Sequence, residues 1–298
     1  MNKILITGAS GQLGGLVVKH LLETEKLAPA RLIAGSRDPS KLDALAARGV
    51  ETAKVDFDDA HSLSDASGRA ETVLIISTDA LDEPGKRLRQ HKAAVEAAAN
   101  AGVKHLAYTS MPKTEPGNPV LFAPDHYGTE QTLKASGITY TIFRNSWYQE
   151  NLLMSLPQTV RSGTWYTSAG DGKTAHIARD DVARAIAASL AKGPAANATY
   201  TLTGAKAYTN AEIAALAAEA TGKPVKVVDL NDEALAEGMK AAGVSEAFIP
   251  LLVSFEANAR AGGLAEVTGD FEKLTGSTQK PLTAFLEESK ALLSGATE

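Results

Sequence analysis

The sequence predicts an α/β fold, in which a doubly wound parallel sheet is followed by a smaller, mostly helical C-terminal lobe. In the first half of the 298-residue chain, short runs rich in β-branched residues alternate with longer segments rich in Ala and Leu. This alternation is typical of parallel strands joined by crossover helices. After Trp147 the alternation ends and helical segments predominate. We therefore expect one lobe over residues 1–147 and a second over residues 148–298, with some of the later segments returning to the sheet.

Six short apolar segments are expected to form the sheet. These strands are residues 3–7, 31–36, 52–55, 72–77, 105–109 and 139–143. The segments between them have helical periodicity and are rich in Ala, Leu, Glu and Lys. The helices predicted there are residues 12–22, 41–48, 61–68, 86–101 and 125–135. Crossovers of this kind place helices on both faces of the sheet.

The second half is predicted to be mostly helical, with a few strand-like pieces. The expected strands are residues 164–167, 199–202 and 226–230. The expected helices are residues 150–156, 179–190, 210–220, 232–241, 246–257 and 282–293. Because no Gly/Ser linker precedes this half, we expect it to pack on the sheet and to form one wall of a cleft.

The composition points to a folded protein that acts on a small molecule. Hydrophobic residues make up 44% and charged residues 22%, and the net charge of −5 comes without a basic run that would attract nucleic acid. The chain has no cysteine, and its histidines lack metal-ligand spacing, so no metal site is expected. No stretch approaches the roughly 18 apolar residues that span a bilayer, and no signal peptide is evident. We expect a cytoplasmic monomer or homodimer.

A glycine-rich turn follows the first predicted strand, with the spacing G-x-x-G-x-x-G. Gly8 allows a sharp turn, Gly11 allows close approach of a pyrophosphate to the backbone, and Gly14 allows the helix to pack on the strand. The N-terminus of that helix then faces the anion. This strand–turn–helix context predicts a Rossmann-type dinucleotide site. Its expected residues are Gly8, Ala9, Ser10, Gly11, Gln12 and Leu13.

The end of the second strand selects between the two nicotinamide cofactors. A carboxylate at this position usually binds the ribose 2′-hydroxyl of NAD. Here the strand ends in Ser36 and Arg37, and Asp38 follows one residue too late for that contact. A guanidinium fork with a neighbouring hydroxyl suits a 2′-phosphate, so the sequence predicts NADP(H).

Two further strand ends carry candidate cofactor residues. After the third strand, Asp56 or Phe57 is expected beside the adenine, while Asp58 has the alternative role of capping the next helix. After the fourth strand, Ser77, Thr78 and Asp79 lie where the carboxyl ends of the strands open onto the crevice of an α/β sheet.

Several motifs, taken with the glycine turn, give the sequence a family resemblance. They are A-Y-T-S at residues 107–110, R-N-S-W-Y-Q-E-N at 144–151, A-G-D-G-K at 169–173 and Y-T-L-T-G at 200–204. The chain resembles the NmrA-like branch of the atypical short-chain dehydrogenases/reductases over essentially its whole length. Within that branch it is similar to the bacterial NADPH:quinone oxidoreductases (type 2) and the triphenylmethane reductases.

The resemblance implies that the NADP(H) site extends beyond the glycine turn. The additional residues are Asn145, Ser146, Trp147, Tyr148, Gln149, Glu150 and His176. Asn145 follows the sixth strand, where the nicotinamide half is expected, and its side chain is a candidate to orient the carboxamide. Trp147 and Tyr148 have the alternative role of core aromatics that join the two lobes.

The usual catalytic pair of short-chain dehydrogenases is incomplete. These enzymes place a Tyr four residues before a Lys on one helix, and the ammonium lowers the pKa of the phenol. Here Tyr127 is followed by Gln131, a neutral amide, although Ser110 stands where such enzymes keep a polarising hydroxyl. Alcohol oxidation by that mechanism is disfavoured. The remaining candidates are Asn145, His126 as a group that protonates near neutral pH, and Tyr127 as a neutral donor.

Hydride transfer from NADPH to a quinone makes lighter demands on a site. The acceptor is already electrophilic, so positioning and hydrogen bonds to the developing oxyanion suffice. The resemblance therefore implies an NADPH-dependent oxidoreductase that reduces a quinone or a similar aromatic acceptor. Two alternatives stay open: a triphenylmethane dye reductase, and an NADP(H)-binding redox sensor without turnover.

Overall fold

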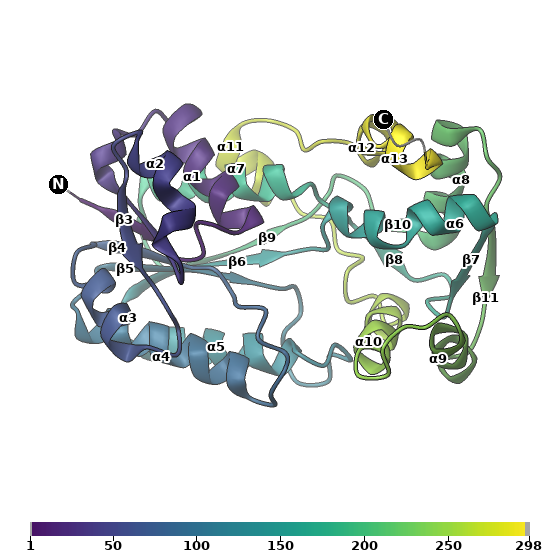
Figure 1. The fold of residues 1–298 in the computed structure, drawn as a ribbon, viewed down its shortest axis with the longest axis horizontal. Helices are drawn as coiled ribbons and strands as arrows, with labels where there is room; N and C mark the ends of the chain where they lie inside the picture. Colours follow the sequence, from purple (N-terminus) through teal and green to yellow (C-terminus); the bar gives the residue numbers. More distant parts are fainter. Residues whose placement is uncertain (1, 296–298) are drawn as a thin grey trace.

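A seven-stranded parallel sheet forms the first lobe of the computed structural model, which describes residues 2–295 (Figure 1). The strands are β1 (Ile4–Ile6), β2 (Leu32–Ser36), β3 (Glu51–Lys54), β4 (Thr72–Ile75), β5 (His105–Ser110), β6 (Thr139–Asn145) and β9 (Ala198–Leu202). Their spatial order is β3-β2-β1-β4-β5-β6-β9, so the winding direction reverses between β1 and β4. This confirms the predicted doubly wound sheet.

Helices cover both faces of the sheet, as Figure 1 shows. One face carries α1 (Gln12–Glu23), α2 (Asp43–Ala46), α7 (Arg179–Lys192) and α11 (Asp270–Thr275). The other carries α3 (Ala60–Ser67), α4 (Lys86–Asn100) and α5 (Ala123–Ala135). Helices α1 and α7 present apolar stripes to the strands, because apolar residues recur every three to four positions, whereas α4 and α5 also bury several polar side chains.

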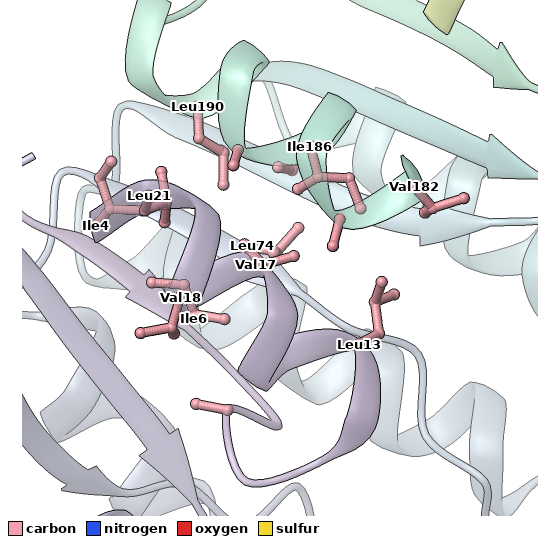
Figure 2. Close-up of a cluster of buried hydrophobic side chains, with 14 of the residues drawn as sticks. Ile4, Ile6, Leu13, Val17, Val18, Leu21, Leu74, Val182, Ile186 and Leu190 are labelled. Atoms are coloured by element: carbon pink, nitrogen blue, oxygen red, sulfur yellow. The ribbon is translucent and has the colours of Figure 1, made fainter. Parts of the chain in front are cut away.

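The contact between α1 and α7 is central to the first of these faces. Figure 2 shows Val17 and Leu21 of α1 gathered with Ile186 and Leu190 of α7, and all four side chains are buried. Helix α7 lies far along the chain, in the half predicted to form the second lobe. Strand β9, which pairs with β6, and helix α11 also come from that half and complete the first lobe.

The second lobe packs helices around two small sheets (Figure 1). Its helices are α6 (Leu156–Ser162), α8 (Asn210–Thr221), α9 (Asp232–Ala241), α10 (Ile249–Arg260), α12 (Leu282–Glu288) and α13 (Lys290–Ser294). Strand β7 (Thr164–Thr167) pairs with β11 (Lys226–Asp229) in parallel, and β8 (Lys173–Thr174) pairs with β10 (Tyr208–Thr209) antiparallel. The lobe has its own apolar cluster, which includes Leu156, Ile213 and Phe285.

Several predicted helices are interrupted or shifted, and prolines account for most of these differences. The segment predicted at residues 150–156 is a 3-10 helix, η3 (Gln149–Met154), and α6 begins next to Pro157. The segment at 41–48 divides into η2 (Pro39–Leu42) and α2, and Pro250 lies in the first turn of α10. A proline fits the first turn of a helix and is disfavoured inside one, so it sets the start. A further 3-10 turn, η1 (Pro29–Arg31), precedes β2.

Candidate functional site

The glycine turn between β1 and α1 has the strained geometry that its sequence implies. Gly8 has a φ of +62°, and its carbonyl accepts a hydrogen bond of 2.9 Å from the Gly11 N–H. A β-carbon on Gly14 would overlap the Gly8 carbonyl, so only glycine lets α1 pack this closely on the turn. Gly11 is the N-cap of α1, and neither a capping side chain nor an acidic residue occupies the first turn. The free N–H groups of that turn form a site for an anion.

The end of β2 separates the roles of three consecutive residues. Ser36 is buried, with its hydroxyl 2.8 Å from that of Ser10 in the glycine turn. Asp38 accepts hydrogen bonds from the backbone N–H and the hydroxyl of Ser40, which lower the pKa of its carboxyl. The Asp38 carboxylate is therefore committed to capping η2. Arg37 is exposed beside the turn and forms no ion pair within residues 2–295.

A cavity of about 460 Å³ opens at the carboxyl ends of β1, β4, β5 and β6. Gln12 and Leu13 line it from α1, and Ile76, Ser77 and Asp79 follow β4. Residues 109–111 and 145–148 line it after β5 and β6, and Phe255 of α10 closes it from the second lobe. The cavity thus runs from the glycine turn to the interface between the lobes. This is the cleft position expected at the topological switch point of an open α/β sheet.

Many of the predicted residues lie either on the wall of this cavity or at the glycine turn beside it. Those on the cavity wall are Gln12, Leu13, Ser77, Asp79, His126, Asn145, Ser146, Trp147 and Tyr148. Those around the glycine turn and the end of β2 are Gly8, Ala9, Ser10, Gly11, Ser36 and Arg37. Asn145 and Ser146 are nearly fully buried, and Asn145 Oδ1 and Ser146 Oγ have no hydrogen-bond partner among the described residues. They are polar atoms suited to a carboxamide.

Other predicted residues have structural partners away from the cavity wall. Both carboxylate oxygens of Glu150 accept the Arg179 N–H, at 3.1 and 3.0 Å, at the start of α7. Gln149 donates to the Lys280 carbonyl at 3.0 Å. His176 is buried, and burial lowers its pKa to about 4. Of these contacts, the one from Glu150 ties η3 to α7 of the first lobe.

The residues after β3 make local contacts. Phe57 packs against the apolar cluster under α3 and α4, and Asp56 accepts the Asp58 N–H. The alternative role given to Asp58 is wrong. Asp59 caps α3 by accepting the N–H groups of His61 and Ser62, because it immediately precedes the helix.

Trp147 and Tyr148, the two aromatic residues after β6, both line the cavity and also pack against other side chains. The Trp147 ring lies 5.0 Å from Phe255, edge to face, and is stacked with Phe122 at 6.4 Å. It therefore joins the lobes while forming part of the cavity wall. The Arg179 guanidinium lies 4.8 Å from the centroid of the Tyr148 ring.

Ser110 lies on the cavity wall, but its hydroxyl proton is committed elsewhere. It donates to Glu130 Oε1 at 2.7 Å, and the same carboxylate accepts two hydrogen bonds from Arg144, at 2.9 and 2.7 Å. Glu130 is fully buried. Ser110 consequently offers lone pairs to the cavity rather than a proton. Glu130 lies in no recognisable motif, so its burial could not be predicted from the sequence. Tyr127 is partly exposed on the same helix and does not line the cavity.

His126 does line the cavity, but the expectation that it protonates near neutral pH is wrong. It is 3% exposed, and burial, reinforced by the nearby Arg87 cation, lowers its pKa well below 6.5. Arg87 Nη2 donates to His126 Nε2 at 3.0 Å, so the ring carries its proton on Nδ1. That proton points at the Tyr108 hydroxyl, 2.8 Å away. His126 is therefore a neutral acceptor toward Arg87.

Arg87 and His91 of α4 together hold Thr78. Neither Arg87 nor His91 was predicted as a site residue, whereas Thr78 was. Arg87 Nε donates to the Thr78 carbonyl at 2.7 Å, and the Thr78 N–H donates to His91 Nε2 at 2.9 Å. The backbone N–H and carbonyl of Thr78 are thus both hydrogen-bonded, which fixes Ser77 and Asp79 on the cavity wall.

Within residues 2–295, no helix is both long and apolar enough to cross a membrane.

Known proteins resemble this chain over almost its entire length. Quinone oxidoreductase 2 of Escherichia coli is 36% identical over 273 residues, which cover 92% of this chain and 93% of that protein. The E. coli NADPH-dependent quinone oxidoreductase complexed with NADPH matches with a TM-score of 0.90 at 34% identity, covering 96% and 99% of the two chains. The Citrobacter sp. triphenylmethane reductase complexed with NADP(H) matches with a TM-score of 0.89 at 32% identity, covering 97% and 100%.

A further relative reduces a different class of acceptor. An NAD(P)H azoreductase of Xenophilus azovorans is 31% identical, and the match covers 97% of each chain. The NmrA-like family model matches residues 1–284. The resemblance predicted from the sequence motifs is confirmed, and the chain belongs to the NmrA-like family.

Proposed function

We propose that this protein is an NADPH-dependent oxidoreductase that transfers a hydride to a quinone or a similarly electrophilic aromatic acceptor. The observation that carries the proposal is a cavity that extends from the first turn of α1, at Gln12 and Leu13, to Phe255 of the second lobe. One end suits the pyrophosphate, and the other has room for an acceptor beside the nicotinamide. The relatives named as NADPH-dependent quinone oxidoreductase, triphenylmethane reductase and azoreductase support the same chemistry.

The cofactor would be held from the ends of β1, β2 and β6. The first turn of α1 binds the pyrophosphate, and Arg37 with Ser36 binds the 2′-phosphate. Asn145 Oδ1 and Ser146 Oγ, which lack hydrogen-bond partners in the described residues, orient the carboxamide. Bound NADPH supplies a hydride, and the aromatic wall at Trp147 and Phe122 excludes water from the acceptor.

The side chains at the cavity favour an acceptor that needs no strong acid or base. Ser110 has committed its proton to Glu130, and His126 is neutral. A quinone suits these conditions, because the first product of hydride transfer is a stabilised hydroquinone anion that water protonates. A cytoplasmic location and a monomeric or homodimeric state remain predictions.

Steady-state NADPH oxidation with 1,4-benzoquinone tests the proposal directly. We expect turnover with NADPH and much weaker turnover with NADH. Tight NADP(H) binding without turnover across a panel of quinones, azo dyes and triphenylmethane dyes would instead support a redox sensor. Turnover confined to the triphenylmethane dyes would identify a dye reductase.

A further inference from the structure

Arg87 is a buried cation on the wall of the cavity. Its side chain is 7% exposed and lines the cavity together with Phe122 and His126. Nε donates to the Thr78 carbonyl and Nη2 to His126, while the guanidinium carbon lies 4.7 Å from the centroid of the Phe122 ring. Three neighbours therefore fix the plane of the guanidinium.

None of these neighbours neutralises the charge. The partners of Arg87 are a carbonyl, a neutral imidazole and an aromatic face, and no carboxylate of residues 2–295 forms an ion pair with it. Nη1 is buried without a hydrogen-bond partner in that range. Asp125 and Asp79, the latter on the same cavity wall, attract the charge without forming a hydrogen bond or an ion pair with it. A guanidinium stays protonated even where burial lowers its pKa, so a positive charge without an ion-pair partner in residues 2–295 faces the cavity.

From this arrangement, which rests on the proposed function, we propose that Arg87 is a specificity-determining residue that stabilises the anion formed when the acceptor is reduced. The chemistry of a quinone fits it. As the C4–H bond of NADPH breaks, the hydride adds to the quinone and an electron pair moves onto a carbonyl oxygen. The products are NADP+ and a hydroquinone anion, which takes its proton from water. The fixed charge favours the anion over the neutral quinone.

The same charge has the opposite consequence for a cationic dye. A triphenylmethane cation loses its positive charge when it accepts a hydride, so no anion forms. Arg87 therefore selects acceptors whose reduced form carries negative charge on oxygen, which makes quinones the preferred class within the proposed function.

The first test compares two acceptors in the variants Arg87→Met and Arg89→Met. Arg89 lies on the same helix but is exposed and paired with Glu83, which makes it a matched control. We expect R87M to lower kcat with 1,4-benzoquinone at least about tenfold and R89M to have no effect. Turnover of a cationic triphenylmethane dye should not fall in R87M. An equal fall with both acceptors would assign Arg87 a structural role and overturn the proposal.

The second test needs no turnover. 4-Nitrophenol resembles a hydroquinone in size, and its visible absorbance reports its ionisation when it binds to the NADP+ complex. We expect the wild-type and R89M proteins to lower the pKa of bound 4-nitrophenol and R87M not to. An identical pKa in all three proteins would refute the charge effect. A lowered pKa without quinone turnover would retain Arg87 as an anion site while rejecting the proposed function.

Discussion

Ser110 lies 2.7 Å from the buried carboxylate of Glu130 and donates its hydroxyl proton to it. In a dehydrogenase that polarises a carbonyl through this serine, its loss would cost about 100-fold or more in rate. Here we expect Ser110→Ala to keep kcat with benzoquinone within about threefold, because the proton never faces the acceptor. The free energy of unfolding should fall by about 1.5 kcal/mol, since a hydrogen bond to a charged group is lost. A 100-fold loss of kcat in an otherwise stable variant would show that Ser110 is the polariser.

The close contact of α1 with the glycine turn predicts opposite effects for two neighbouring glycines. Gly14→Ala should abolish tight NADPH binding and destabilise the fold by about 1–3 kcal/mol, because its β-carbon overlaps the Gly8 carbonyl. Gly15→Ala places a β-carbon 3.5 Å from the nearest atom, the Ala9 oxygen, and should stabilise the helix by up to about 1 kcal/mol. Urea unfolding and NADPH titration of both variants check this. Equal destabilisation by both would contradict it.

The exposed Arg37 beside the turn predicts the cofactor preference. Arg37→Ala should raise KM for NADPH about 10- to 100-fold, as expected for the loss of a charge-assisted contact to a phosphate, and leave KM for NADH nearly unchanged. Arg48→Ala, which removes an exposed arginine paired with Glu23, is the control and should change neither. Equal effects of the Arg37 variant on both cofactors would remove this residue from the phosphate site.

The carboxylate of Glu150 caps α7, which predicts a structural rather than a cofactor role. Glu150→Ala should lower the free energy of unfolding by about 1 kcal/mol, because the Arg179 N–H loses its acceptor. The KM for NADPH should stay within about twofold. A large rise in KM with unchanged stability would place Glu150 in the cofactor site instead.

Four of the buried histidines make the fold sensitive to mild acid. Burial lowers the pKa of His91 to about 3, of His105 and His176 to about 4, and of His126 well below 6.5. As the pH falls below about 6.5, the unfolded chain binds protons that the folded chain does not, so stability is lost toward the folded-state pKa values. Each such histidine contributes about 1.4 kcal/mol per pH unit in this window.

Urea unfolding between pH 7 and pH 5 measures this loss. His105→Gln should reduce the slope of the free energy of unfolding against pH by about 1.4 kcal/mol per pH unit, which corresponds to one proton. His61→Gln, at an exposed position, should leave the slope unchanged. A flat dependence in the wild-type protein would show that the four imidazoles bind protons equally well in the folded and unfolded states, so that burial does not lower their pKa values.

The fold and the cofactor half of the site could be predicted from sequence because both depend on local pattern. The geometry of residues 8–14 can be predicted because the requirement for glycine arises within a single turn. The strand ends can be predicted from the apolar periodicity. The acceptor half could not be predicted. The charge of Arg87 and the proton of Ser110 are set by partners 39 and 20 residues away in the chain, His126 and Glu130. His126 was misjudged for the same reason, since its burial depends on how α5 packs against α4 and β5.

The contribution of α7, β9 and α11 to the first lobe also governs how the chain can be assembled during synthesis. When residue 147 leaves the ribosome, six strands are available, but the apolar side of α1 has no cover and β6 is an open edge. Both defects persist until residues 179–202 have emerged, and Phe271 of α11 arrives later still. During this interval the nascent chain exposes the apolar side of α1 and the unpaired edge of β6. Both are surfaces of the kind that chaperones bind.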